Sequence, residues 1–383
     1  MGLLSDAKAL RRFHGLAAEE RRLVFYAESR ADWPHFRAVL AALESRWDRP
    51  IPYLTSDPQD PVLSEPGGQL RPFCIGSGVV RTWAFQAMRA DVLALTLPDL
   101  QTYQLKRSVH GVHYAYLQHS LNSTHRVYRR GAFDHYDTIF CAGPHHTAEV
   151  RRTEEVYGLP HKALVEHGYG RLDAILERAA DREVTPRASS DAKEVLLAPS
   201  WGECSFIEAP CGRELLRALL SAGHRLTLRL HPMTVRRMPQ LASELSAELA
   251  PSGRFVVETD MDASKSLAAS DLMVSDWSGA ASEYAFGLEK PVLFIDTPAK
   301  INNPEHDRID LPPLEKHMRS EIGRILAPSE VAEAARAVAQ LCADANGFAR
   351  GIREARNRWV FNVGRSGEVG AEALLSIVAA NPG

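Results

Sequence analysis

DLMVSDWSGAASEYAFGLEKPVLFID, residues 271–296, carries the clearest structural signal in this chain of 383 residues. Its apolar run Leu272–Val274 predicts a buried strand, which ends at the small residues of Ser275–Gly279. A helical pattern follows as far as Ala285, and the apolar run Val292–Ile295 predicts the next strand. A strand, a tight turn, a helix and a strand in this order are typical of a parallel α/β sheet.

The turn in this stretch is also a candidate anion site. Backbone N–H groups and the helix dipole together favour an anion at a helix N-terminus, so Ser278 and Gly279 are predicted to bind phosphate. A plain structural turn is the alternative. Glu283, on the helix that follows, either hydrogen-bonds a ribose or faces solvent. The sequence has no GxxxxGK[ST] and no GxGxxG, which disfavours an ordinary NTPase or dehydrogenase.

The same alternation of strands and helices runs along the whole chain. A polar segment at residues 174–193 is the predicted linker. We therefore expect an α/β protein of two Rossmann-like domains, residues 1–180 and 190–362, that face each other across a cleft. The helical tail, residues 363–383, is expected to pack back on the first domain. Further strands are predicted at residues 23–26, 51–54, 73–75, 91–98, 114–117, 138–141, 163–166, 195–198, 226–230 and 255–257.

Composition restricts the class of protein. Hydrophobic residues make up 45% and charged residues 24%, with a net charge of −3, so we predict a globular protein that binds no nucleic acid. The five cysteines form no CxxC pair, which fits a reducing cytoplasm. No apolar run is long enough to cross a bilayer, so any membrane contact is expected to be peripheral, on the inner face.

Arginines gather locally despite the balanced total charge. One cluster contains Arg126, Arg129 and Arg130, and another contains Arg151 and Arg152. Such clusters usually form a solvated face. The alternative is a dock for anionic lipid head groups or for a polyanionic acceptor.

His119 is the leading candidate for a catalytic residue. Nine of the fifteen histidines lie between His110 and His167, and His119 directly follows the strand predicted at residues 114–117. An imidazole at that end of a strand can accept a proton from an attacking hydroxyl. A buried histidine bonded to a carbonyl is the alternative. The pair His145 and His146 has no carboxylate at a ligand spacing, so no metal site is predicted.

Two more strand ends carry polar residues in the second predicted domain. Arg229 and His231 end one strand, and their cationic and donor groups suit a diphosphate or a departing phosphate. Ser200 ends another strand, beside a glycine that permits close approach of a ligand. Together with Ser278, these residues predict a nucleotide-diphosphate site along one edge of the sheet.

Eight segments of the chain form a recognisable series. They are LVFYAESRADWPHF, YLTSDPQDP, LQHSLNSTHRVYRRGAFDHYDTIFCAGPHH, HGYGRLD, LLAPSWGE, RLHP, SDWSGAASEYAFGLEKPVLFID and NNPEH. Taken in order, they resemble the CDP-glycerol glycerophosphotransferase family, which includes teichoic-acid primases and polymerases and relatives that serve spore coats and capsules. The resemblance implies a GT-B-type fold, with an acceptor-binding first domain and a donor-binding second domain. It also implies His119 as catalytic base, His231 at the donor phosphates, and Asp276, Ser278 and Gly279 around the pyrophosphate.

The chain departs from the better-known polymerases at two of these positions. They carry His-Gly-Thr where this chain has His119-Ser120-Leu121, and often a Thr-Trp-Arg-like sequence where Ser200-Trp201-Gly202 stands. The first difference changes the acceptor side, and the second removes a cation near the donor. The identity of the acceptor and the polyol carried by the donor therefore stay open. It also stays open whether the enzyme primes a chain or extends it.

The predicted activity is transfer of glycerol phosphate, or a related polyol phosphate, from a CDP-activated donor to a hydroxyl of a glycan or lipid-linked acceptor, with release of CMP. No organic cofactor is expected, and Mg²⁺ at the diphosphate stays open. The alternatives are a glycosyltransferase of the same architecture, a nucleotide-sugar 2-epimerase, and a non-catalytic scaffold that binds nucleotide sugars. The sequence gives no prediction of oligomeric state.

Overall fold

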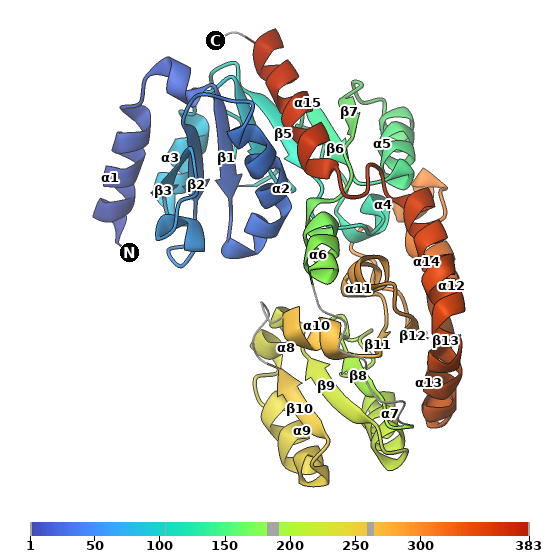
Figure 1. The fold of residues 1–383 in the computed structure, drawn as a ribbon. Helices are drawn as coiled ribbons and strands as arrows, with labels where there is room; N and C mark the ends of the chain where they lie inside the picture. The colour runs from blue at the N-terminus through green and yellow to red at the C-terminus, as the bar shows by residue number, and fades with distance from the viewer. Residues whose placement is uncertain (1, 104, 182–190, 259–263, 382–383) are drawn as a thin grey trace. The chain divides into compact units, whose positions relative to one another are not determined.

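The computed structural model of this chain describes residues 2–103, 105–181, 191–258 and 264–381, which form two compact units (Figure 1). The first unit is built from three segments, Met1–Ala174, Asn302–Leu311 and Trp359–Gly383. The second is built from Ile175–Ile301 and Pro312–Arg358.

The first unit contains a seven-stranded sheet in the order β3-β2-β1-β4-β5-β6-β7. All of its strand pairs are parallel. The order reverses between β1 and β4, and side chains at the carboxyl ends of strands near such a reversal commonly bind ligands. The strands are β1 (Leu23–Ala27), β2 (Ile51–Thr55), β3 (Leu70–Cys74), β4 (Val92–Leu95), β5 (His113–Leu117), β6 (Thr138–Cys141) and β7 (Ala163–Glu166).

Both faces of this sheet are covered, because its central strands β1 and β4 carry apolar or aromatic residues at every position. Neighbouring residues point to opposite faces, so Tyr116 belongs to one core cluster and Leu117 to the other. The covering helices are α1 (Leu3–His14), α2 (Trp33–Glu44), α3 (Val79–Gln86), α4 (Thr124–Val127), α5 (Pro144–Tyr157) and α15 (Ser366–Ala380), with short 3₁₀ turns η1 (Ala18–Arg21), η2 (Arg30–Asp32), η3 (Pro61–Leu63) and η5 (His306–Ile309).

The last helix of the chain, α15, packs against α2 (Figure 1). Two glycines permit this close approach. A Cβ atom at Gly367 would lie 2.5 Å from the carbonyl oxygen of Ala38, and one at Gly370 would lie 2.7 Å from Cγ2 of Val39. The helix also contributes Leu374 to the core of the first unit.

The second unit contains a six-stranded parallel sheet in the order β10-β9-β8-β11-β12-β13, which reverses between β8 and β11. Its strands are β8 (Glu194–Leu197), β9 (Arg225–Arg229), β10 (Phe255–Glu258), β11 (Leu272–Ser275), β12 (Val292–Ile295) and β13 (Gly323–Leu326). Its helices are α7 (Pro210–Ser221), α8 (Pro232–Arg237), α9 (Leu241–Leu249), α10 (Ser264–Ala269), α11 (Ala280–Leu288), α12 (Leu314–Glu321), α13 (Ala334–Ala343) and α14 (Ala345–Trp359), with 3₁₀ turns η4 (Ala250–Ser252) and η6 (Pro328–Glu333).

The structure corrects three sequence-based expectations. The predicted linker at residues 174–193 begins inside a helix, α6 (Gly170–Ala180), because apolar residues at helical spacing occur among its polar residues. Residues 182–190 of the predicted linker lie outside the described part of the chain. Strand β13 was not expected, because Gly323 and Arg324 interrupt its apolar run. Residues 302–311 belong to the first unit, not to the second, because Asn302 and Asn303 bond to backbone carbonyls of Arg126, Val127 and His125.

Within the described residues, we find no helix that combines the length and the apolar character needed to span a bilayer.

Candidate active site

His119 lies just beyond β5, and a tyrosine hydroxyl contacts each nitrogen of its ring. The Tyr116 hydroxyl is 2.9 Å from Nδ1, and the Tyr128 hydroxyl is 3.2 Å from Nε2. A neutral imidazole has one donor and one acceptor nitrogen, which matches two hydroxyl partners. Burial raises the pKa of both tyrosines, so the hydroxyls stay protonated. Nε2 of His119 is therefore able to contact a hydroxyl group.

The protonation of His119 depends on two opposing effects. Burial lowers the pKa of the imidazole, and the negative charge of Asp32 raises it and offsets part of that shift. The net direction is downward, so the ring is neutral at pH 7. A neutral histidine is the form that can accept a proton from a hydroxyl.

Asp32, whose charge acts on His119, is not marked by any sequence motif. Its Oδ1 accepts a hydrogen bond from the Thr96 hydroxyl at 2.9 Å, and its Oδ2 accepts from the amides of Glu28 and Ser29. Asp32, Thr96 and His119 follow β1, β4 and β5, which are adjacent strands. The available signal was a carboxylate a few residues after a buried strand, at the sheet edge where ligands bind.

The segment after His119 is held by three side chains of α5. His145 and His146 contact the carbonyls of Leu121 and Asn122 at 2.9 and 3.0 Å. The Glu149 carboxylate accepts from the amide and the hydroxyl of Thr124, both at 2.6 Å. The histidine pair thus anchors backbone, and no metal-binding cluster occurs among the described residues.

In the second unit, Asp276 links two strand ends. Its Oδ1 accepts from the Ser200 amide at 2.8 Å, and its Oδ2 accepts from the Phe206 amide at 3.3 Å. The side chain is 1% exposed, and burial raises the pKa of the carboxyl. Asp276 therefore fixes the shape of the loop that carries Ser200, rather than presenting an open carboxylate.

Ser278 and Gly279 lie where β11 passes into α11. Gly279 is the N-cap residue, and within the described residues the amides of Ser278 and Gly279 make no hydrogen bond with protein groups. Such amides suit an anion. Glu283 lies in the first turn of α11 and is half-buried.

Arg229 and His231 follow β9 but differ in what they offer to a ligand. The Arg229 guanidinium pairs with Glu258 at 2.6 Å and donates to the Ser266 hydroxyl at 2.8 Å, so its charge is already neutralised. His231 accepts the Met233 amide on Nδ1 at 3.1 Å, which leaves its proton on Nε2. Burial first, and then the charge of Lys300, lower the pKa of His231 to about 4. His231 is thus a neutral hydrogen-bond donor.

Two cations around Trp201 were not foreseen from the sequence. The Lys300 ammonium lies 2.7 Å from the centre of the indole ring, and the Arg237 guanidinium lies 5.9 Å from it. Neither side chain has an ion pair among the described residues. A Cβ atom at Gly202 would lie 3.5 Å from Nη1 of Arg237, so a neighbouring helix supplies a cation close to this glycine. Both residues are far from Trp201 in the sequence, so the sequence alone does not indicate that they lie beside its ring.

Most of the residues described above, around His119 in the first unit and around Trp201 in the second, lie within one family match. The profile of CDP-glycerol:poly(glycerophosphate) glycerophosphotransferases matches residues 108–300, about half of the chain. The chain belongs to this glycerophosphotransferase family. It is an enzyme of CDP-glycerol glycerophosphotransferase type, as the resemblance predicted. The match includes all predicted site residues from His119 to Glu283, and also Lys300, whereas Asp32 lies outside it.

Solved structures similar to this glycerophosphotransferase confirm the predicted GT-B-type fold of two Rossmann-like domains. One is the wall teichoic acid polymerase TagF soaked with CDPG, at 13% identity over 99% of both chains, with a TM-score of 0.58. Others are UDP-GlcNAc 2-epimerases. That of Methanocaldococcus jannaschii, in complex with UDP-GlcNAc and UDP, has 13% identity over 93% of this chain and 99% of its own, with a TM-score of 0.60. That of Neisseria meningitidis, bound to UDP-GlcNAc, has 12% identity over 92% and 99%, with a TM-score of 0.61. The sequence matches no curated protein.

Proposed function

We propose that this enzyme transfers glycerol phosphate, or a related polyol phosphate, from a CDP-activated donor to a hydroxyl of a cell-surface glycan or lipid-linked acceptor. CMP is the leaving group. The observation that carries the proposal is the neutral His119, whose Nε2 already meets a hydroxyl 3.2 Å away. The family match supports the donor, and the similarity to TagF, a wall teichoic acid polymerase, supports a teichoic-acid-like acceptor.

On the acceptor side, we assign the first unit and give His119 the role of general base. The acceptor hydroxyl replaces Tyr128 at Nε2 and passes its proton to that nitrogen as its oxygen attacks the β-phosphorus. Asp32 stabilises the imidazolium that forms, because its charge raises the pKa of His119. The bond from the β-phosphorus to the oxygen of CMP breaks as the new phosphoester forms.

On the donor side, we assign the second unit. The Nε2–H group of His231 and the amides of Ser278 and Gly279 donate to oxygens of the diphosphate. Lys300 and Arg237 supply the positive charge that Arg229, paired with Glu258, does not offer. Ser200 shapes the loop before Trp201, and Glu283 is assigned to the ribose. Asp276 acts by holding that loop.

A donor screen tests the proposal. The protein is incubated with CDP-glycerol, CDP-ribitol or UDP-GlcNAc, with a polyol-phosphate-terminated glycan as acceptor and with Mg²⁺ or EDTA. Mass spectrometry then identifies the nucleotide released. We expect CMP from a CDP-polyol, and UDP release instead of CMP would replace this function with a glycosyltransferase or epimerase.

The same assay tests His119. We expect His119→Ala to lower kcat by at least about 10²-fold, the usual contribution of a general base, with CDP-glycerol binding kept. His110→Ala is the matched control, because His110 is an exposed histidine outside the cluster. Normal turnover by His119→Ala would refute the assigned role.

A further inference from the structure

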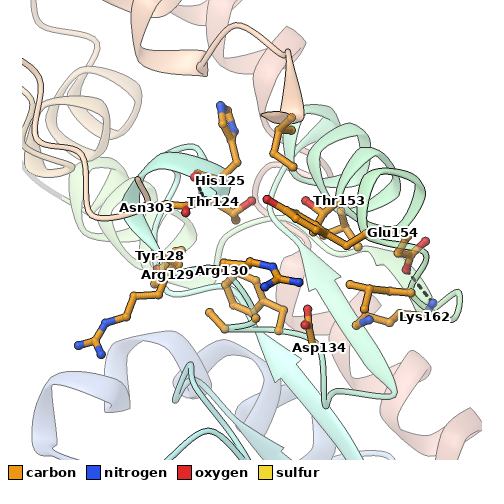
Figure 2. Close-up of a pocket in the computed structure, with 17 residues that line it drawn as sticks. Thr124, His125, Tyr128, Arg129, Arg130, Asp134, Thr153, Glu154, Lys162 and Asn303 are labelled. Carbon is orange, nitrogen blue, oxygen red and sulfur yellow. Dashed lines mark hydrogen bonds between the residues drawn. The ribbon is translucent and has the colours of Figure 1, made fainter. Parts of the chain in front are cut away.

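A pocket beside His119 lies wholly within the first unit and has no role in the function proposed above. It is open to solvent and lies between α4, α5, η5 and the segment after Tyr128 (Figure 2). The apolar part of its wall includes Ala132, Phe133, Val150, Leu159 and Ile309.

Lys162 contributes a positive charge to the wall of this pocket. The residue as a whole is 6% exposed, and among the described residues its ammonium has no ion pair. The nearby Glu154 carboxylate does not neutralise it, because Glu154 accepts from Arg151 at 2.6 Å, from His161 at 2.8 Å and from the Lys162 amide at 2.8 Å. An ammonium without a counter-charge in a pocket wall favours an anionic ligand.

A second cation lines the same space. The Arg130 guanidinium lies 4.5 Å from the centre of the Tyr157 ring, and that of Arg308 lies 4.9 Å from it. Figure 2 shows Arg130, Lys162 and Asp134 reaching toward one another around the pocket. Asp134 is the opposing charge, and it has no ion pair among the described residues. The arginine cluster noted in the sequence therefore has two members, Arg129 and Arg130, in a pocket wall rather than on a plain solvated face.

Tyr128 connects the pocket to the catalytic histidine. Its side chain lines the pocket, and its hydroxyl is the group 3.2 Å from Nε2 of His119. A ligand held in the pocket would thus have one end next to the position where the acceptor hydroxyl must lie.

We propose that this pocket binds the phosphate of the acceptor's terminal polyol phosphate, with Lys162 and Arg130 as the residues that contact it. The identity of the acceptor rests on the proposed function. Cations bind the phosphate oxygens, and the apolar wall receives the carbon chain of the polyol. A polymer end and a phosphoglycerol lipid head group share this chemistry.

Binding of sn-glycerol 3-phosphate tests the pocket without turnover. Calorimetry is done with CMP present at saturation, so that the donor site is occupied, and glycerol is the uncharged control. We expect the wild type to bind glycerol 3-phosphate, and Lys162→Gln and Arg130→Gln each to weaken binding roughly tenfold or more. Asp134→Asn, which removes the opposing charge, should strengthen it. Arg130 is exposed, so its variant separates lost binding from lost folding.

Vesicles of phosphatidylglycerol and of phosphatidylcholine distinguish the two sources of the phosphate. In one outcome, the wild type binds phosphatidylglycerol vesicles but neither phosphatidylcholine vesicles nor glycerol 3-phosphate. If Lys162→Gln abolishes that binding, the result supports the pocket with a lipid head group as its ligand. Absence of binding to either probe, or binding that all three substitutions leave unchanged, overturns the inference. Release of CMP from CDP-glycerol is measured separately, so failure of the pocket leaves the proposed function standing.

Discussion

Lys300 shows how one side chain can give donor binding a pH dependence. Burial first, and then the charge of Arg237, lower the pKa of its ammonium to about 8. The group is therefore charged at pH 7 and largely neutral at pH 9. His231 stays neutral over this range, because its pKa is about 4.

We expect the affinity for CDP-glycerol to fall as pH rises from 7 to 9, by up to about tenfold, because a neutral amine attracts phosphate weakly. Calorimetry at both pH values measures this change. The Lys300→Arg variant keeps its positive charge at both pH values and leaves every neighbouring group in place. Its affinity for CDP-glycerol should therefore vary little between pH 7 and pH 9. An equal slope in both proteins would assign the pH dependence to another group.

At the scale of elements, side chains of α5 hold the segment that follows His119. Glu149 is fully buried, which by itself raises its pKa, but the His125 ring 3.3 Å away and the nearby His145 and His146 lower the pKa to about 2. Its folded pKa is thus below the unfolded one. The resulting stability is present above about pH 4 and is lost as pH falls toward 2.

We expect Glu149→Gln to lower the free energy of unfolding by about 1–3 kcal/mol, since it removes charge-assisted hydrogen bonds to Thr124. It should also lower kcat, because the segment after His119 loses its anchor. Thermal unfolding and the CMP assay measure the two effects. Glu155→Gln on the same helix is the control, since the one ion pair that Glu155 forms with a described residue is the exposed pair with Arg152. An equal loss there would contradict the anchoring role.

Much of the element order was predictable because buried parallel strands are short apolar runs. The strands at residues 138–141, 163–166 and 292–295 were predicted with their observed bounds. Strand β13 was not, because Gly323 and Arg324 break its run at a sheet edge. Strand ends also pointed to His119, Ser200 and His231. Arg237 and Lys300 could not be found this way, because only the folded chain brings them to Trp201.

At the scale of the whole molecule, each unit is built from segments that are far apart in the sequence. The first unit needs α15, from the end of the sequence, to cover α2. The contact depends on a glycine: a side chain on Gly367 would meet the backbone of Ala38.

We expect Gly367→Ala to destabilise the protein by about 1–3 kcal/mol, because the two helices must separate to admit the methyl group. Gly351→Ala in α14 is the matched control. A Cβ there would meet only ordinary contact at 4.0 Å, and alanine is the better helix former by about 1 kcal/mol, so stability should rise slightly. Differential scanning calorimetry measures both variants. A rise in melting temperature for Gly367→Ala would show that the helices are not in close contact.

The position of α15 also has a consequence for synthesis. A ribosome that has made the first 174 residues has synthesised all seven strands of the first sheet, but not the helix that brings Leu374 to its core. Until α15 has been made and has left the ribosome, the nascent chain carries an uncovered apolar face, which is prone to aggregate. Chains cut short by a late nonsense mutation should therefore be recovered in inclusion bodies, even though every catalytic side chain has been translated.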